Sequence, residues 1–144
     1  MATKTKKEIG KASRNKGKRG ELEIVKILKV AGFEKAQRSA QCKGNTGDAA
    51  DVEGLPGIHI EVKRVERLNL KKAYEQAVND SKENGNNDIP AVFHRGSYQP
   101  WMVTFSLEDF LKLYKKGMLT NENEERKSHW RSYNGKRYRN RSLP

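Results

Sequence analysis

The stretch DAADVEGLPGIHIEVK, residues 48–63, predicts a β-hairpin. In its second half, residues 58–63, apolar and polar side chains alternate, which is the pattern of a strand with one apolar face. The Leu-Pro-Gly segment before this strand fits a three-residue hairpin loop in which the glycine takes the left-handed conformation. Because the length of the loop sets the register of a hairpin, we expect Asp51 to lie opposite Glu61.

This pairing places like charges together, and two acidic side chains directly opposite each other on a strand pair repel. Lys63 lies one step further along the same face as Glu61. A divalent cation between the acids would remove the repulsion, and Mg²⁺ is typically held by one or two carboxylates together with water and phosphate oxygens. Acids, a lysine and such an ion are sufficient for phosphodiester hydrolysis. The alternative is that Glu61 and Lys63 are ordinary solvated residues on an exposed strand face.

The positive charge of the chain lies at its two ends. Thirty Lys and Arg against 18 Asp and Glu give the 144 residues a net charge of +12. Residues 1–20 hold eight basic residues and one acid, residues 111–144 hold ten and three, and the segment between them holds 12 and 14. We predict one domain with a core over residues 20–117, a flexible basic arm over residues 1–19 and a basic aromatic tail over residues 118–144.

The basic ends favour a polyanionic partner, which could be a nucleic acid or an anionic membrane surface. In the tail, the run HWRSYNGKRYRNR interleaves arginines, which hold phosphates, with aromatic rings, which stack on unpaired bases. The alternative is a tail that packs its aromatic rings on the protein's own surface.

Cysteine content and hydropathy predict an intracellular, cytoplasmic protein. Cys42 is the single cysteine, so an internal disulfide is excluded and a reducing compartment is expected. No apolar run approaches the roughly 18 residues that a membrane span needs. No apolar segment follows the basic N-terminus, as a secretory signal would require.

Helical and extended segments alternate along the chain. Apolar residues at helical spacing follow Gly20 in ELEIVKILKVAGF, and Asn69 and Ser106 are N-cap residues before two further helices. Strands are predicted over residues 33–40, 89–94 and 101–105. The order helix, weak strand, hairpin, helix, two strands and helix indicates an α/β or α+β fold with a mixed β-sheet flanked by helices.

The pattern D-V-x(8)-E-V-K, preceded by a helix with an N-terminal glutamate, resembles the PD-(D/E)XK nuclease superfamily. The arrangement GELEIVKILKVAGFEKAQRSA, then DV, then IHIEVK is most similar to archaeal-type Holliday junction resolvases and related phage endonucleases. The resemblance spans residues 17–80. Ala50 stands where these families have a proline before the aspartate, which makes Asp48 a rival for Asp51. In a continuous strand Asp48 would point to the opposite side, so we prefer Asp51.

The resemblance implies a restriction-endonuclease-like mixed sheet and a catalytic role for each matching residue. Asp51 and Glu61 would bind Mg²⁺ or Mn²⁺ with the Val62 carbonyl as a further ligand. Lys63 would position the attacking water. Glu21 would complete the acidic cluster from the helix end, although an acid at this place is also favoured by the helix dipole alone.

The resemblance and the basic ends together give the remaining candidates. Arg38 would contact a phosphate, and Gln76 on the helix after E-V-K is a candidate site residue; exposed polar residues without a role are the alternative for both. The candidate nucleic-acid contacts are Lys18, Arg19, Arg38, Arg64, Arg131, Arg137 and Arg139.

We therefore expect a metal-dependent DNA endonuclease that acts on branched DNA as a homodimer, since paired cuts need two sites. One alternative is a phage or restriction-type nuclease that cuts duplex or flapped DNA, with the same site and a different DNA geometry. A phage-encoded enzyme would act in the host cytoplasm. Another alternative is a non-catalytic DNA-binding module, which would not need the joint presence of Asp51, Glu61 and Lys63.

Overall fold

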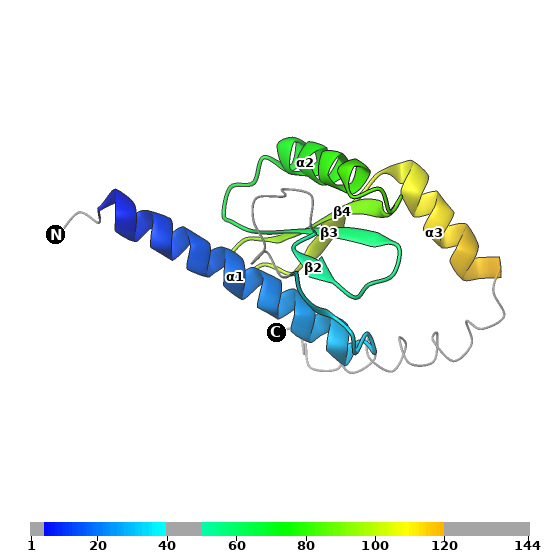
Figure 1. Cartoon of the computed structure of the whole chain (residues 1–144), viewed down its shortest axis with the longest axis horizontal. Coiled ribbons are helices and arrows are strands. Elements are labelled where there is room, and N and C mark those ends of the chain that lie inside the picture. Colours follow the sequence, from blue (N-terminus) through cyan, green and yellow to red (C-terminus); the bar gives the residue numbers. More distant parts are fainter. Residues whose placement is uncertain (1–4, 40–49, 120–144) are drawn as a thin grey trace, which may run out of the picture. The chain divides into compact units, whose positions relative to one another are not determined.

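The computed structural model describes residues 5–39 and 50–119 and contains a five-stranded sheet and three helices (Figure 1). The chain divides into two compact units, Met1–Phe105 and Ser106–Pro144, and the sheet lies in the first. The elements are α1 (Lys6–Val30), β1 (Gln37–Arg38), β2 (Val52–Glu53), β3 (Ile58–Arg64), α2 (Leu70–Glu83), β4 (Ile89–Arg95), β5 (Met102–Thr104) and α3 (Leu107–Leu119). No helix within these residues is long and apolar enough to cross a membrane.

The strands lie in the order β1-β2-β3-β4-β5, so each strand pairs with its neighbour in the sequence. β3 and β4 are parallel, and the other pairs are antiparallel. The predicted α/β class with a mixed sheet is therefore confirmed. Parallel neighbours need a crossover connection, and α2 provides it between β3 and β4.

The predicted hairpin register is also confirmed, because Val52 of β2 pairs with Ile60 of β3. Gly57 closes the loop with φ +79°, and the amide of Ile58 donates to the carbonyl of Leu55. This left-handed conformation is one that glycine adopts without steric cost.

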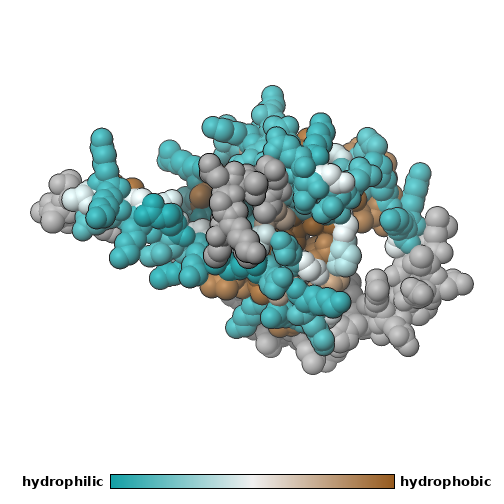
Figure 2. Space-filling model, in the orientation of Figure 1, coloured by the Kyte–Doolittle hydropathy of each residue, from teal (hydrophilic) through white to brown (hydrophobic). Residues whose placement is uncertain are grey.

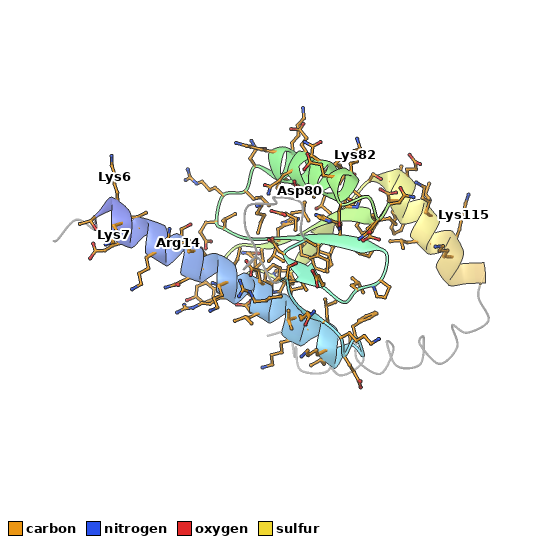
Figure 3. The ribbon with its side chains drawn as sticks, viewed as in Figure 1. Lys6, Lys7, Arg14, Asp80, Lys82 and Lys115 are labelled. Carbon is orange, nitrogen blue, oxygen red and sulfur yellow. The ribbon has the colours of Figure 1, made fainter. Side chains whose placement is uncertain are left out.

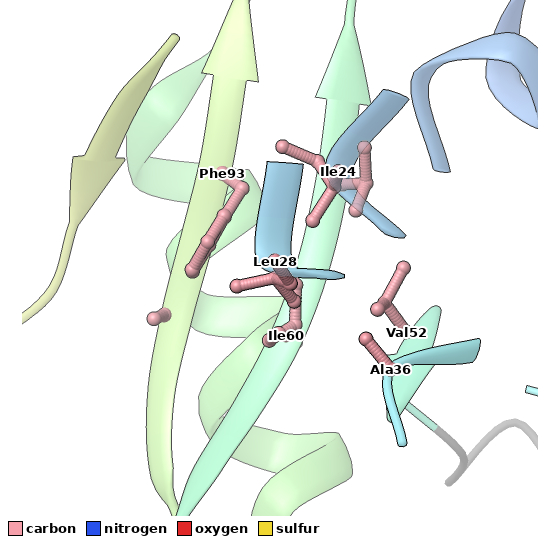
Figure 4. Close-up of a cluster of buried hydrophobic side chains, with 8 residues drawn as sticks. Ile24, Leu28, Ala36, Val52, Ile60 and Phe93 are labelled. Carbon is pink, nitrogen blue, oxygen red and sulfur yellow. The ribbon is translucent and has the colours of Figure 1, made fainter. Parts of the chain in front are cut away.

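The core lies between α1 and one face of the sheet. Figure 4 shows Ile24 and Leu28 of α1 beside Ile60 and Phe93, and these side chains belong to one buried cluster. A second cluster joins Ala73 and Ala77 of α2 to Val92. Since successive residues of a strand point to opposite faces, the neighbours Val92 and Phe93 place α2 and α1 on opposite sides of the sheet.

Helix α1 begins at Lys6, so the expectation that the first helix begins near Gly20 was wrong, and the flexibility of the N-terminal arm stays a prediction. Thr5 is the N-cap, and its side chain and that of Glu8 form a reciprocal capping box. The prediction relied on apolar periodicity, which residues 6–19 lack, and overlooked this capping signal. Gly20 lies inside the helix instead, where it lets α1 approach β3 closely: an added Cβ would meet the Cβ of Arg64 at 3.0 Å.

Gly54 is the position at which the hairpin depends most on glycine. It has φ +99°, and an added Cβ would lie 2.5 Å from the Lys35 carbonyl oxygen and 2.6 Å from the Ala36 Cα. Gly57 also has a positive φ, but nothing lies within 4 Å of an added Cβ there. Backbone atoms cannot move aside as a flexible side chain can, so Gly54 is constrained by space as well as by conformation.

We predict that Gly54→Ala lowers the free energy of unfolding by more than about 3 kcal/mol, because strain and overlap add. The control Gly57→Ala should cost only the left-handed strain, about 1–2 kcal/mol. Urea denaturation followed by circular dichroism measures both. Equal losses in the two variants would contradict the close packing of the hairpin against residues 35–36.

Candidate functional site

Asp51 is held beside β3 by its backbone and by its side chain. Its amide donates to the Ile60 carbonyl at 2.9 Å, and its Oδ2 accepts the amide of Val62 at 2.8 Å. The aspartate lies one residue before β2 and is bonded to residues 60 and 62 of β3, on both sides of Glu61. The hairpin thus brings together the two acids that the sequence paired.

Glu61 and Lys63 lie on the face of β3 towards α2. Glu61 is only 3% exposed, and its Oε1 lies 2.5 Å from Nζ of Lys63. The same ammonium group lies 3.4 Å from Oε1 of Gln76 on α2. A carboxylate this deeply buried is costly unless it is paired, and Lys63 provides the paired charge.

A second ion pair joins the first helix to the edge strand of the sheet. Nε of Arg38 on β1 lies 2.5 Å from Oε2 of Glu21 on α1. The side chain of Glu21 is 16% exposed and that of Arg38 is 33% exposed. Glu21 is also near enough to Asp51 to repel its charge. Carboxylates from α1, from the residue before β2 and from β3 therefore lie here with two cationic side chains.

The protonation of Asp51 reflects this crowding of acids. Burial raises the pKa of Asp51 to about 7, and repulsion by Glu61 and Glu21 acts in the same direction. The hydrogen bond from the Val62 amide and the positive charge of Lys63 act against the rise. When Asp51 is ionised, its charge adds to those of Glu21 and Glu61, and only Arg38 and Lys63 are paired with these acids.

A divalent cation fits this surplus of negative charge, although the described residues contain no group of three His, Cys, Asp or Glu side chains arranged to hold a metal ion. A closed, all-protein metal site is not formed within them. Mg²⁺ does not require one, because it is commonly held by one or two carboxylates and completes its coordination with water and phosphate oxygens.

The other residues that were predicted to contact DNA differ in how accessible they are. Lys18 and Arg19 are exposed on α1. Nε of Arg64 forms an ion pair with Oε1 of Glu23 at 3.3 Å, and its side chain is only 20% exposed, so a role for it in DNA contact would require that pair to open. Asp48, the rival to Asp51, lies outside the described residues, as do Arg131, Arg137 and Arg139.

Two further features were not predicted. Glu23 of α1 pairs with Arg64 and, at 3.2 Å, with Arg95 of the adjacent strand, and Trp101 donates to the same carboxylate. This acid separates two like charges that sheet pairing places side by side. His59 is 1% exposed, and neither ring nitrogen has a hydrogen-bond partner among the described residues. Strand alternation places His59 on the same face as Glu61, but nothing in the sequence indicates its burial.

No protein family model and no curated protein matches the chain. Among solved structures, it is similar to Hjc from Archaeoglobus fulgidus, a Holliday junction resolvase from an archaeal hyperthermophile. The TM-score is 0.47 and the sequence identity is 24%, over 62% of this chain and 76% of that chain. This is a likeness in fold over part of the chain.

We predict that Asp51→Asn stabilises the metal-free protein at neutral and alkaline pH. Because the pKa of Asp51 is raised by folding, the folded state binds this proton more tightly, and wild-type stability falls as the pH rises from about 4 through about 7. The amide carries no charge, so the stability of the variant relative to wild type should grow over this range by about 2 kcal/mol, after allowance for partial solvent screening.

Urea denaturation in EDTA at a series of pH values measures this difference. Glu75→Gln, an exposed acid on α2, is the control and should show no comparable growth. A difference between Asp51→Asn and wild type that stays constant with pH would contradict the crowding of acids.

Proposed function

We propose that the chain is a metal-dependent endonuclease that hydrolyses phosphodiester bonds in DNA, with branched DNA such as a four-way junction as its preferred target. One observation carries the proposal: Asp51 and Glu61 lie close enough to repel each other, and the ammonium group of Lys63 contacts Glu61. This is a pair of carboxylates with an adjacent cation, which suits a hard metal ion and a phosphate.

The residues of the hairpin would divide the chemistry among themselves. Asp51 and Glu61 would hold Mg²⁺ or Mn²⁺, together with the Val62 carbonyl. When bound, the ion supplies a water of lowered pKa and neutralises charge that develops on the phosphate. Lys63 would orient the attacking water or hold a phosphate oxygen as a compact positive charge.

Two further residues would support this arrangement. Gln76 lies near enough to Lys63 to direct one of its N–H groups, which restricts the ammonium group to fewer orientations. Arg38 now neutralises Glu21, and a phosphate placed between them would compete for its guanidinium group. Arginine suits such an exchange because its planar group binds carboxylates and phosphates alike.

DNA as the partner is supported by the charge of the chain. A net charge of +12 attracts a polyanion. Lys18 and Arg19 would bring part of that charge to the helix that carries Glu21, and the tail with Arg131, Arg137 and Arg139 would add more. The preference for branched DNA and the homodimer follow from the resemblance of the motifs to resolvases.

We predict that Asp51→Asn, Glu61→Gln and Lys63→Ala each lower the single-turnover cleavage rate by at least about a hundredfold, because each removes a charge that acts on the reacting phosphate. Asp51→Asn should also keep or increase the affinity for DNA in the absence of metal, since it removes a negative charge. Glu53→Gln, an exposed acid of the same hairpin, is the control and should cut at the wild-type rate.

The assay uses labelled four-way, flapped and linear duplex DNA of matched sequence in Mg²⁺, with EDTA as the blank. Wild-type rates for the site variants would mean that the site is assigned to the wrong residues. Faster cleavage of linear or flapped DNA would favour a phage or restriction-type nuclease. Binding without cleavage of any substrate would favour a non-catalytic DNA-binding module.

We also predict that Mn²⁺ stabilises the wild-type protein. An ion that binds only the folded state at a hundredfold excess over its dissociation constant adds about 2.7 kcal/mol to the free energy of unfolding. Thermal denaturation measures this gain, which Asp51→Asn should largely abolish. Equal gains in wild type and Asp51→Asn would show that the ion binds elsewhere.

A further inference from the structure

The N-terminal half of α1 runs beyond the sheet, as Figure 1 shows. The buried residues of this helix are Gly20, Ile24 and Leu28, all in its second half. Residues 6–19 therefore contribute nothing to the core. Figure 2 shows that the visible face of this part of the helix is largely hydrophilic. Because this helical segment does not pack against the core, its surface is available to bind a partner.

Four basic residues lie along one face of this segment and form what we call the basic stripe. They are Lys7, Lys11, Arg14 and Lys18. Their separations of four, three and four residues place them on one side of an α-helix. All four are exposed, and none takes part in an ion pair with another described residue. Figure 3 shows Lys7 and Arg14 on the segment that runs past the sheet.

The basic stripe leads to the candidate site. Lys7 and Arg14 precede Glu21 by fourteen and seven residues, and a heptad spacing returns to the same helix face with a drift of only about 20°. Glu21 is the helix residue that pairs with Arg38 and repels Asp51. The basic stripe and Glu21, the residue that α1 contributes to the candidate site, therefore lie on the same side of α1.

An ion pair on a different face of the helix, which we call the anchor, joins this part of α1 to the loop after β3. Nζ of Lys16 lies 2.9 Å from Oε1 of Glu66, in the loop after β3. Glu66 also accepts the amide of Ser97 at 3.0 Å and its hydroxyl group, in the loop after β4. These hydrogen bonds hold the pKa of Glu66 at about 2, so the anchor stays charged at any ordinary pH. Lys16 points away from the basic stripe by helical spacing, which leaves the stripe accessible.

We propose that the basic stripe binds the phosphate backbone of a duplex arm that adjoins the scissile phosphate, and thereby sets the shortest arm that the enzyme engages. This inference rests on the proposed function. The fourteen residues from Lys7 to Glu21 span about 21 Å of helix, which matches about 6 base pairs of duplex. Arms shorter than this cannot reach the outermost lysine, so they bind more weakly.

The experiment compares two triple variants that each remove three positive charges. The stripe triple is Lys7→Gln, Lys11→Gln and Arg14→Gln. The control triple is Lys6→Gln, Lys26→Gln and Lys82→Gln, which are exposed and lie off the stripe. Glutamine has nearly the helix propensity of lysine and arginine, so the helix should persist in both.

The probes are four-way junctions with hairpin-closed arms of about 4 or about 12 base pairs, bound in EDTA and followed by fluorescence anisotropy. Wild type and the control triple should bind the long-armed junction at least about tenfold more tightly than the short-armed one, a difference of about 1.4 kcal/mol. The stripe triple should lose this preference. The slope of its log binding constant against log salt concentration should become shallower by about 0.9 for each phosphate that it no longer neutralises.

Cleavage separates this inference from the proposed function. In Mg²⁺, the control triple should cut the long-armed junction at the wild-type rate, since its three substitutions lie off both the stripe and the candidate site. A stripe triple that keeps the arm-length preference, or a control triple that loses it equally, overturns the inference. Failure of wild type to cut any DNA overturns the proposed function, and the binding comparison still decides the role of the stripe.

Discussion

The pairing of Val52 with Ile60 is the constraint on which the candidate site depends. It follows from a short loop closed by Gly57 and from Gly54, which passes the backbone of residues 35–36 without a side chain. A shift of one residue would turn every side chain of β3 to the other face. Glu61 would then lie in the apolar core beside α1, and Asp51 would lose its hydrogen bond from Val62.

A site built in this way is costly to the folded protein. Three acids gather where burial already disfavours charge, and two cationic side chains balance only part of it. Proteins commonly retain such local instability where function requires it. The same acids that weaken the fold in isolation provide the charge that a cation and a phosphate would need. Under the proposed function, stability and activity would make opposite demands on Asp51.

The sequence predicted features with local causes and missed those formed by distant segments. The hairpin register and the helix cap at Asn69 depend on neighbouring residues, and both are found. The capping box of Thr5 was equally local, but it was overlooked because residues 6–19 carry no apolar stripe. The pair of Arg38 with Glu21 joins two elements that only the tertiary fold brings together, so the sequence indicated the residues but not their contact.

Glu66 has a consequence for how the surface tolerates substitution. It is an exposed acid, and exposed acids are usually replaced at little cost. Here one carboxylate connects the first helix, the loop after β3 and the loop after β4. Changes in these three segments should therefore be epistatic with one another, although they are far apart in the chain. A mutational scan would find this position sensitive to substitution, although its solvent exposure alone suggests that it tolerates other residues.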